Sequence, residues 1–319
     1  MTLSLLEPPL ITRLRRHERI LIAGAGGGFD VYAGLPLYVA LRTAGREVSL
    51  ANLTFTTLGE TDARYVAPHL AVATLETMGA ERYFPERRLA EWLHEAGYPP
   101  SVYAFEKVGV RPLRAAYEHL VRALDVTAVV LIDGGTDILM RGDEAGLGTP
   151  EEDMTSLAAV SRLVGVESFV ASIGFGVDTY HGVCHSHVLE SIAAIERDGG
   201  YLGAFAVTAA MPEGRAYLSA VSRAQAMTPG RPSIVNGSIA AAIEGQFGDV
   251  RFTPRTADGE LFINPLMSIY FCFELAALAR RSLYLDQLEG TESIFEVSAR
   301  IEAFRNGMAA TRPRRAIPH

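Results

Sequence analysis

Acidic side chains gather where the most hydrophobic strand pattern of the chain ends. Residues 128–132 read Ala-Val-Val-Leu-Ile, and the five residues that follow are Asp133, Gly134, Gly135, Thr136 and Asp137. Two glycines directly after a buried strand allow a ligand to approach the backbone closely. Carboxylate oxygens in such a place suit Mg²⁺ or the hydroxyl groups of a substrate. We therefore predict that Asp133 and Asp137 bind a metal, and that Gly134, Gly135 and Thr136 contact the substrate.

A second cluster of reactive side chains lies further along the chain, with three histidines and a cysteine in seven residues: His181, Cys184, His185 and His187. If a helix begins near Asp178, His181 and His185 lie one turn apart on the same face. Such a pair can bind Zn²⁺, Fe²⁺ or Mn²⁺ with Asp178 as a third ligand, or can act as a general base and its partner. We predict that His181, His185 and Asp178 are catalytic. The alternative is that these histidines only form hydrogen bonds with the backbone.

Two helix starts are compatible with this segment. One is near Asp178; in the other, Ser186 caps a helix that runs from His187 to Arg197. In either case His185 lies where a helix starts at the carboxyl end of a strand. Cys184 could be a nucleophile, but a small buried thiol is the simpler interpretation.

A glycine run follows the first predicted strand, residues 19–24, and contains Gly24, Gly26, Gly27 and Gly28. Glycines there can bring backbone N–H groups close to an anion at a helix start, and a tightly packed turn is the alternative. The dinucleotide fingerprint is not met, because Phe29 stands where the third glycine is required and Asn52, not an acid, ends the second strand. Asp30 would repel a bare phosphate and suits a metal, a ribose hydroxyl or an amine. We predict that the glycines and Asp30 bind substrate, and that Asp30 is also a metal ligand.

The elements that must position these residues alternate between strand and helix. Strands are predicted at residues 19–24, 47–55, 128–132, 168–174 and 202–208, and helices at residues 30–44, 154–164 and 213–227. Residues 61–124 look largely helical, with a short strand at 102–105. Such alternation implies right-handed crossovers and a mostly parallel sheet. We predict an α/β fold with a Rossmann-like, doubly wound sheet, in which ligands bind at the carboxyl ends of the strands.

The pattern changes after residue 230. We expect a hairpin (250–253 and 261–263, with Asp258-Gly259 at the turn), a long apolar helix at 265–285 and a final helix at 293–304. The predicted organisation is an N-terminal arm (1–18), a Rossmann-like core (19–230) and a mainly helical C-terminal elaboration packed on the core (231–319). Asn236 opens a helix and Asn264 precedes another, so we predict that both cap helices. Contact with the ligand is the second possibility for each, and we include Asn236 among the predicted substrate contacts. The stretch 266–279 is apolar on most faces of the predicted helix, which is more than the single apolar stripe that packing on one core requires. We therefore predict a homo-oligomer.

Composition limits the classes of protein. The 319 residues have a net charge of −8, which argues against binding nucleic acid. The basic runs at 13–19 and 312–315 are expected to be solvated termini. The two cysteines form no Cys-x-x-Cys motif, residues 1–10 do not resemble a secretory leader, and no stretch is long and apolar enough to cross a membrane. We expect a cytoplasmic protein whose partner is a small molecule.

Three groups of residues resemble the prokaryotic domain-of-unknown-function family 1152. They are residues 22–30 with 34–37, residues 133–137 with Gly142-Asp-Glu144, and residues 176–181. The resemblance covers about the first 200 residues and implies no established activity. It therefore assigns no catalytic role to Asp143 or Glu144. These two acids are weaker candidates for ligand binding, because an acid in a turn is usually solvated.

Three functions remain open at this stage. The leading one is an enzyme that hydrolyses or transfers a group on a nucleoside-, nucleotide- or sugar-like metabolite, assisted by carboxylates and by a divalent metal (Mg²⁺, Mn²⁺ or Zn²⁺) rather than by an organic cofactor. The second is a nucleotide-cofactor enzyme with a degenerate glycine fingerprint. The third is a ligand-binding α/β module without catalysis.

Overall fold

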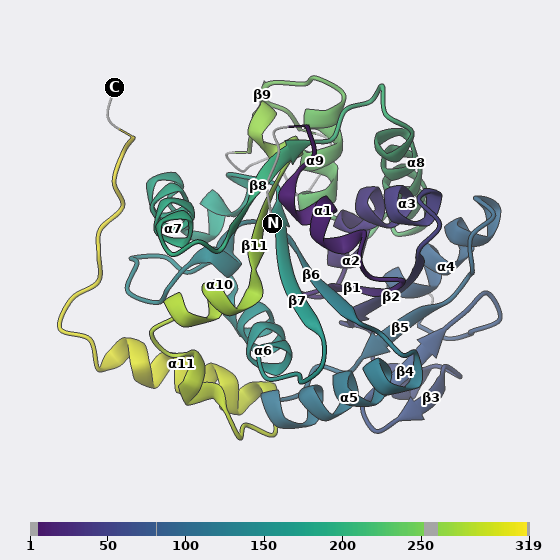
Figure 1. The fold of residues 1–319 in the computed structure, drawn as a ribbon, viewed down its shortest axis with the longest axis horizontal. Coiled ribbons are helices and arrows are strands. Elements are labelled where there is room, and N and C mark those ends of the chain that lie inside the picture. The colour runs from purple at the N-terminus through teal and green to yellow at the C-terminus, as the bar shows by residue number, and fades with distance from the viewer. Residues whose placement is uncertain (1–5, 81, 252–260, 318–319) are drawn as a thin grey trace.

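The computed structural model describes residues 6–80, 82–251 and 261–317. Nine strands in these residues form one sheet in the order β3-β4-β5-β2-β1-β6-β7-β11-β8 (Figure 1). Its centre is parallel and consists of β5 (Val102–Phe105), β2 (Glu47–Leu53), β1 (Arg19–Gly24), β6 (Ala128–Gly134) and β7 (Glu167–Ile173). The predicted α/β class and the Rossmann-like, mostly parallel sheet are confirmed.

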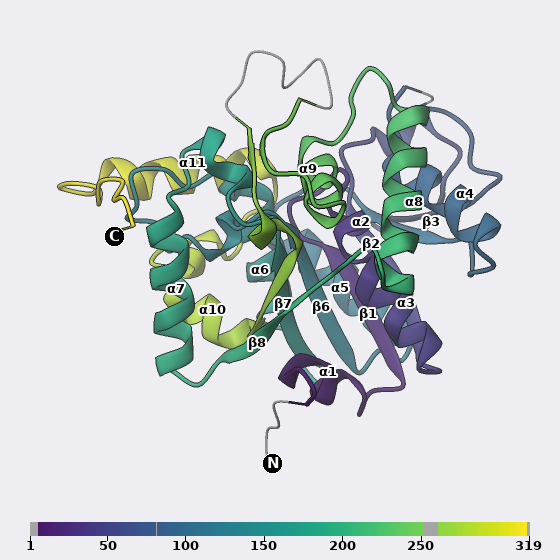
Figure 2. The ribbon, with the colours of Figure 1, turned by 90° about the horizontal axis from the view of Figure 1, so that it is seen from above.

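Helices cover both faces of the sheet and bury two separate cores (Figures 1 and 2). One face is covered by α1 (Pro9–Leu14), α2 (Asp30–Ala33), α3 (Leu35–Thr43), α4 (Pro85–Glu95), α8 (Pro212–Met227) and α9 (Ile234–Ile243). The other is covered by α5 (Val110–Ala123), α6 (Pro150–Val160), α7 (His185–Arg197), α10 (Leu275–Arg281) and α11 (Ile294–Asn306). Strand β1 serves both cores, because Leu21 and Ala23 face one and Ile20 and Ile22 face the other. This two-sided burial explains why the central strands read as unbroken apolar runs. No helix in the described part of the chain is long and apolar enough to cross a membrane.

The sheet has a topological switch point between β1 and β6. The chain leaves β1 for β2 on one side and later returns to β6 on the other side of β1. Gly24 at the end of β1 pairs in register with Asn52 of β2 and with Ile132 of β6. The loops that follow these strands therefore start side by side, which is where open α/β sheets bind ligands.

The helical prediction for residues 61–124 is wrong in its first part. Strands β3 (Arg64–Ala67) and β4 (Leu70–Ala73) form an antiparallel hairpin that pairs with β5. The four residues of β4 are all buried, and a short apolar run of that kind does not distinguish a buried strand from a helix segment. The predicted helix 30–44 is interrupted at Gly34, since α3 starts anew with Pro36 in its first turn.

The long helix predicted at residues 265–285 is also wrong. The segment consists of a 3₁₀ turn, η5 (Pro265–Ser268), strand β11 (Ile269–Glu274) and the short helix α10. Strand β11 lies antiparallel between β7 and β8 (Tyr201–Ala206), where both of its edges form backbone hydrogen bonds. Its aromatic and β-branched residues favour a strand once two partner strands are present.

The correction at β11 weakens the argument for an oligomer, because most apolar residues of segment 266–279 are buried within the chain itself; Leu266, at 41%, remains exposed. The homo-oligomer stays a prediction. Light scattering of the purified protein is the measurement that tests the assembly. Nearby, β9 (Gly248–Asp249) pairs with β10 (Phe262–Ile263). The second strand of the predicted hairpin is thus within the predicted range, while its described partner lies before the predicted residues 250–253. Its predicted turn at 258–259 lies outside the described residues.

Candidate functional site

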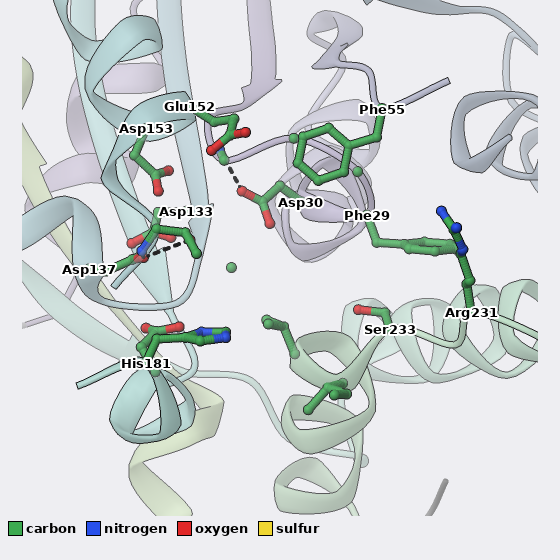
Figure 3. A pocket seen from close by; sticks show the side chains of 18 of the residues that line it. Phe29, Asp30, Phe55, Asp133, Asp137, Glu152, Asp153, His181, Arg231 and Ser233 are labelled. Atoms are coloured by element: carbon green, nitrogen blue, oxygen red, sulfur yellow. Dashed lines mark hydrogen bonds between the residues drawn. The ribbon is translucent and has the colours of Figure 1, made fainter. Parts of the chain in front are cut away.

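A cavity of about 750 Å³ opens at the carboxyl ends of β1 and β6 (Figure 3). Much of its wall comes from the glycine loop after β1, the end of β6, the start of α6, the 3₁₀ turn η3 (Val177–His181) and residues 230–235, which lead into α9. Phe55, Tyr83, Lys107 and Asp137 also line it. The location is the one predicted from the strand ends. Six carboxylates line it among the described residues, and they are Asp30, Asp133, Asp137, Glu152, Asp153 and Asp178.

Three of these carboxylates form a compact group. One oxygen each of Asp30, Asp133 and Asp153 lies within 4.8 Å of the other two. Asp133 and Asp153 are each only 2% exposed. Within the described residues, Oδ2 of Asp133 and Oδ1 of Asp153 are buried and have no hydrogen-bond partner. Buried carboxylate oxygens without a donor are costly, and a ligand that brings positive charge or hydrogen-bond donors would reduce this cost.

The glycine loop and helix α6 hold this group together. The backbone N–H of Gly26 donates to Oδ2 of Asp30 over 2.7 Å, and Oγ of Ser156 in α6 donates to the carbonyl of Ala25 over 2.8 Å. A Cβ atom on Gly26 would lie 2.7 Å from Oδ2 of Asp30 and 3.0 Å from Oδ1 of Asp153. A glycine at this position therefore lets the two carboxylates approach each other.

The electrostatics of the group are those of crowded buried acids. Burial raises the pKa of Asp30 to about 7 and raises the pKa values of Asp133, Asp153 and Asp178 well above their ordinary range. Repulsion between the carboxylates adds to the effect of burial in each case. Lys107 lines the cavity, but its ammonium group is paired with Glu152. The group is thus short of positive charge.

Asp137 and Asp178 line the same cavity but are held by the protein. Oδ2 of Asp137 accepts hydrogen bonds from the N–H and the hydroxyl of Thr149, over 2.8 and 3.1 Å, and so holds the residue that precedes α6. Oδ2 of Asp178 accepts from the N–H of Thr136 over 2.7 Å. We predicted Asp30, Asp133 and Asp137 as metal ligands, whereas the compact group consists of Asp30, Asp133 and Asp153.

The predicted histidine pair is not formed. Helix α7 begins at His185 with Cys184 as its cap, and Gly182 in a left-handed conformation separates it from η3. A short 3₁₀ turn does begin beside Asp178, at Val177, but it ends at His181. The helix that ends at Arg197 starts two residues before the predicted His187, and His185 lies at a helix start as predicted. His181 is exposed and lines the cavity. His185 is not among the described lining residues; its ring stacks on Phe175 at 5.1 Å, and burial lowers its pKa.

The glycines that were assigned to anion binding have structural partners. The N–H of Gly26 is used by Asp30, and the N–H of Gly28 donates to the carbonyl of Leu53. Gly27 and Gly28 have φ values of 84° and 61°, which favour glycine, and both pack against Phe55. Gly24 packs against Asn52 and is not among the described residues that line the cavity.

Of the other predicted substrate contacts, some line the cavity and others have structural roles. Gly134 lines the cavity, whereas a Cβ atom on Gly135 would lie 2.7 Å from Oδ2 of Asp178. Asn236 is buried away from the cavity, and its amide donates to the carbonyl of Phe29 over 3.1 Å. The cap of α9 is Ser233, not Asn236. Asn264 does cap η5, as predicted.

Four charged residues of the cavity were missed from the sequence: Asp153, Glu152, Lys107 and Arg231. The predicted helix at 154–164 starts too late, since α6 begins at Pro150 and places Asp153 in its first turn. The run Pro-Glu-Glu-Asp was an available signal, because proline followed by acids marks a helix start. Lys107 and Arg231 belong to loops that only the tertiary structure brings here.

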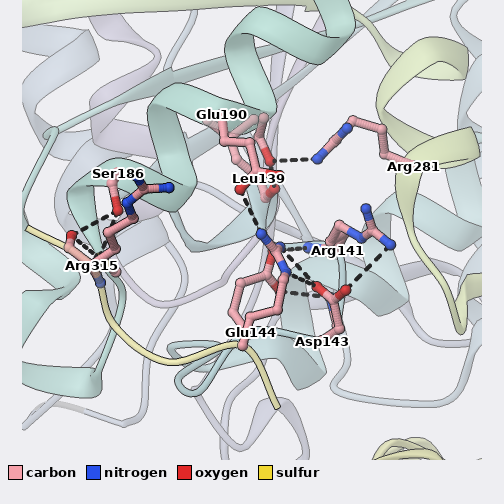
Figure 4. Close-up of polar contacts among 12 residues, drawn as sticks. Leu139, Arg141, Asp143, Glu144, Ser186, Glu190, Arg281 and Arg315 are labelled. Atoms are coloured by element: carbon pink, nitrogen blue, oxygen red, sulfur yellow. Dashed lines mark hydrogen bonds and ion pairs between the residues drawn. The ribbon is translucent and has the colours of Figure 1, made fainter. Parts of the chain in front are cut away.

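Asp143 and Glu144 belong to a different structure, which we call the C-terminal clamp (Figure 4). Glu144 is fully buried and accepts hydrogen bonds from the N–H groups of Arg141 and Gly142. Arg312 donates to Asp143 over 2.8 Å and to Glu144 over 2.9 Å. The prediction that the basic run 312–315 is a solvated terminus is therefore wrong for Arg312. The two acids hold the chain end rather than line the cavity.

These features define the class of protein: a doubly wound α/β protein with an acidic cavity at the topological switch point of its sheet. The model of the family described as "Protein of unknown function (DUF1152)" matches residues 88–307. The chain belongs to this family. The match includes Asp133, Asp153 and His181, while the glycine loop precedes it. A search of curated proteins gave no match.

Proposed function

We propose that this protein is an enzyme that uses a divalent cation, held by Asp30, Asp133 and Asp153, to hydrolyse or transfer a group on a nucleoside-, nucleotide- or sugar-like metabolite. The observation that carries the proposal is the pair of buried oxygens without a hydrogen-bond partner among the described residues, Oδ2 of Asp133 and Oδ1 of Asp153. They belong to a group in which Asp30, Asp133 and Asp153 each place one oxygen within 4.8 Å of the other two. A cation there would offset both the burial and the mutual repulsion of the three acids.

The donor set favours Mg²⁺ or Mn²⁺ over Zn²⁺. All the atoms in the compact group are carboxylate oxygens, which are the ligands that hard cations prefer. Zn²⁺ sites usually include histidine or cysteine, and the described residues of this group include neither. When bound, the cation would polarise a substrate oxygen or activate a water molecule.

The chain's own residues have separable tasks in this proposal. His181, exposed on the cavity wall, donates or accepts a proton as the acid–base group. Asp178 keeps the loop after β6 in place through the N–H of Thr136, and Asp137 keeps the start of α6 in place through Thr149. His185 supports η3 from outside the cavity, with Nε2 3.4 Å from Oγ1 of Thr179. A cytoplasmic location is part of the proposal, and the two free cysteines support it.

Titration calorimetry with MnCl₂ and MgCl₂ tests the cation. Wild type should bind about one equivalent, and Asp153→Asn should weaken the affinity at least tenfold. Asp198→Asn, an exposed acid at the end of α7, is the matched control and should bind as wild type does. Absence of binding to wild type, or equal binding by Asp153→Asn, would overturn the proposed cation site.

Turnover separates an enzyme from a binding module. Release of products from a panel of nucleosides, nucleotides and sugar phosphates, followed by mass spectrometry, should depend on the added cation. It should fall sharply in His181→Gln, whose cation affinity should be unchanged. Ligand binding without any turnover across the panel would favour the non-catalytic module.

A further inference from the structure

The acidic cavity continues into a second cavity of about 600 Å³. The two share Phe55, Tyr83, Gly230 and Arg231 in their walls, so they form one groove. The groove runs from the ends of β1 and β6, past Phe55, to residues 227–231 after α8. Its length exceeds what a metal ion alone would need.

The sign of the charge reverses along this groove. The compact acidic group occupies one end. The charged residues that line the second cavity, among those described, are Arg82, Arg231 and Glu60. Figure 3 shows Arg231 and Ser233 on the opposite side of the cavity from Asp133 and Asp153. A ligand that fills the groove must therefore be cationic, or bound to a cation, at one end and anionic beyond it.

The amino end of α9 faces the acidic group. Ser233 caps this ten-residue helix, and Ile234 and Val235 of its first turn line the cavity. Oδ1 of Asp30 and Cγ1 of Val235 lie 3.0 and 3.2 Å from the position that a Cβ atom on Gly134 would take, so the helix end is close to the carboxylates. Helix amino ends attract anions. The partnerless buried oxygens of Asp133 and Asp153 face this same cavity and independently indicate a ligand in it.

The groove also offers a flat apolar surface between its two ends. Phe55 is 47% exposed, although it is a large aromatic residue, and the ammonium group of Lys107 lies 5.1 Å from its ring centre. The guanidinium of Arg231 lies over the ring of Tyr83 at 5.9 Å. Exposed aromatic side chains beside cations are suited to stacking with a planar, electron-rich ring.

We infer that the groove binds an organic phosphate with a planar ring, and that its phosphate lies between the cation on the acidic group and Arg231 with the amino end of α9. This inference rests on the proposed function and specifies its substrate class. Mg²⁺ commonly joins protein carboxylates to substrate phosphates in this way. The carboxylates would repel a phosphate that arrives without the cation, so phosphate binding requires the metal. The ring stacks on Phe55.

Calorimetry with three probes tests the inference: adenosine monophosphate, ribose 5-phosphate and inorganic phosphate, each with Mg²⁺ and each with chelator. Adenosine monophosphate should bind most tightly, and only with Mg²⁺. Arg231→Gln should weaken all three phosphates at least tenfold while its affinity for Mn²⁺ alone stays as in wild type. Phe55→Leu should weaken adenosine monophosphate but leave inorganic phosphate unchanged. Arg122→Gln, 70% exposed on α5, is the matched control and should behave as wild type does.

The outcomes separate this inference from the proposed function. If Mn²⁺ binds to wild type but none of the three phosphates does, the substrate class is wrong and the cation site stands. If the phosphates bind equally with chelator, the metal-bridged arrangement is wrong. If Mn²⁺ does not bind, the proposed function fails and this inference fails with it. If Arg231→Gln binds the phosphates as tightly as wild type does, Arg231 does not bind the phosphate group and this part of the inference is wrong.

Discussion

Replacing Asp153 with asparagine is expected to stabilise the metal-free protein while weakening its affinity for a divalent cation. The Asp153 carboxyl is 2% exposed, and its Oδ1 has no hydrogen-bond partner in the part of the chain that the structure describes. Burial, and then repulsion from Asp137, Asp133 and Asp30, raises its pKa well above the ordinary range. Asparagine has the same shape without the charge, so it removes the repulsion and keeps the packing.

The stabilisation expected from the substitution can be compared with the stabilisation that a bound cation gives to wild type. Single stabilising substitutions commonly add about 0.5–2 kcal/mol to the free energy of unfolding. At about 2.1 cal/mol/K per residue, the unfolding entropy of 319 residues is about 0.7 kcal/mol/K, so each kcal/mol shifts Tm by roughly 1.5 °C. Metal-free Asp153→Asn should therefore melt about 1–3 °C above wild type. A cation at one hundred times its Kd adds about 2.7 kcal/mol to wild type, whereas a variant with tenfold weaker affinity gains about 1.4 kcal/mol at the same concentration. Excess Mn²⁺ should therefore raise the melting temperature of wild type more than that of Asp153→Asn, and reduce the variant's advantage by about 1.3 kcal/mol or more.

Asp137→Asn provides the contrasting control in the same thermal melts. Oδ2 of Asp137 accepts two hydrogen bonds from Thr149, and a neutral amide oxygen accepts such bonds more weakly than a carboxylate does. We expect a loss of about 1–3 kcal/mol with the stabilising effect of Mn²⁺ retained. If Asp153→Asn lowers Tm in chelator as Asp137→Asn does, and Mn²⁺ stabilises it like wild type, Asp153 is a structural residue and the reasoning from the crowded acids is refuted.

Three further predictions concern other parts of the molecule. Burial raises the pKa of Glu86 to about 7, so the folded protein loses stability as this carboxyl ionises between about pH 4.5 and pH 7. In urea unfolding, the free energy of unfolding of Glu86→Gln should equal that of wild type at pH 4 and exceed it by about 3 kcal/mol at pH 8. Arg312→Ala removes a partner of the buried Glu144 and should cost about 1–3 kcal/mol in the same assay, whereas no change would mean that the C-terminal clamp contributes nothing. Gly26→Ala should displace the acidic group and weaken Mn²⁺ binding by calorimetry, while Gly59→Ala, where a Cβ atom meets nothing within 4 Å, should not; equal affinities would contradict the packing argument.

The sequence by itself determined the fold class and the edge of the sheet that carries the cavity. Continuous apolar runs at 19–24, 128–132 and 168–174 can be buried only in a sheet that is covered on both faces, and the structure confirms all three strands to within a few residues. Parallel strands end at the same edge, so the polar residues that follow Gly24 and Ile132 had to meet there. Asp30 and Asp133 were predictable on that basis.

Only the tertiary structure decided which third acid lies beside Asp30 and Asp133. Asp137 lies three residues after β6, but its carboxylate accepts hydrogen bonds from Thr149 instead. Asp153 reaches the group because Ser156 joins α6 to the glycine loop through a hydrogen bond. Spacing along the chain contains no information about these contacts. The same limit explains β11, because an isolated apolar run forms a strand or a helix according to whether sheet edges are available beside it. What the local pattern of residues specifies is which segments must be buried; which side chains then face one another depends on how the buried segments pack.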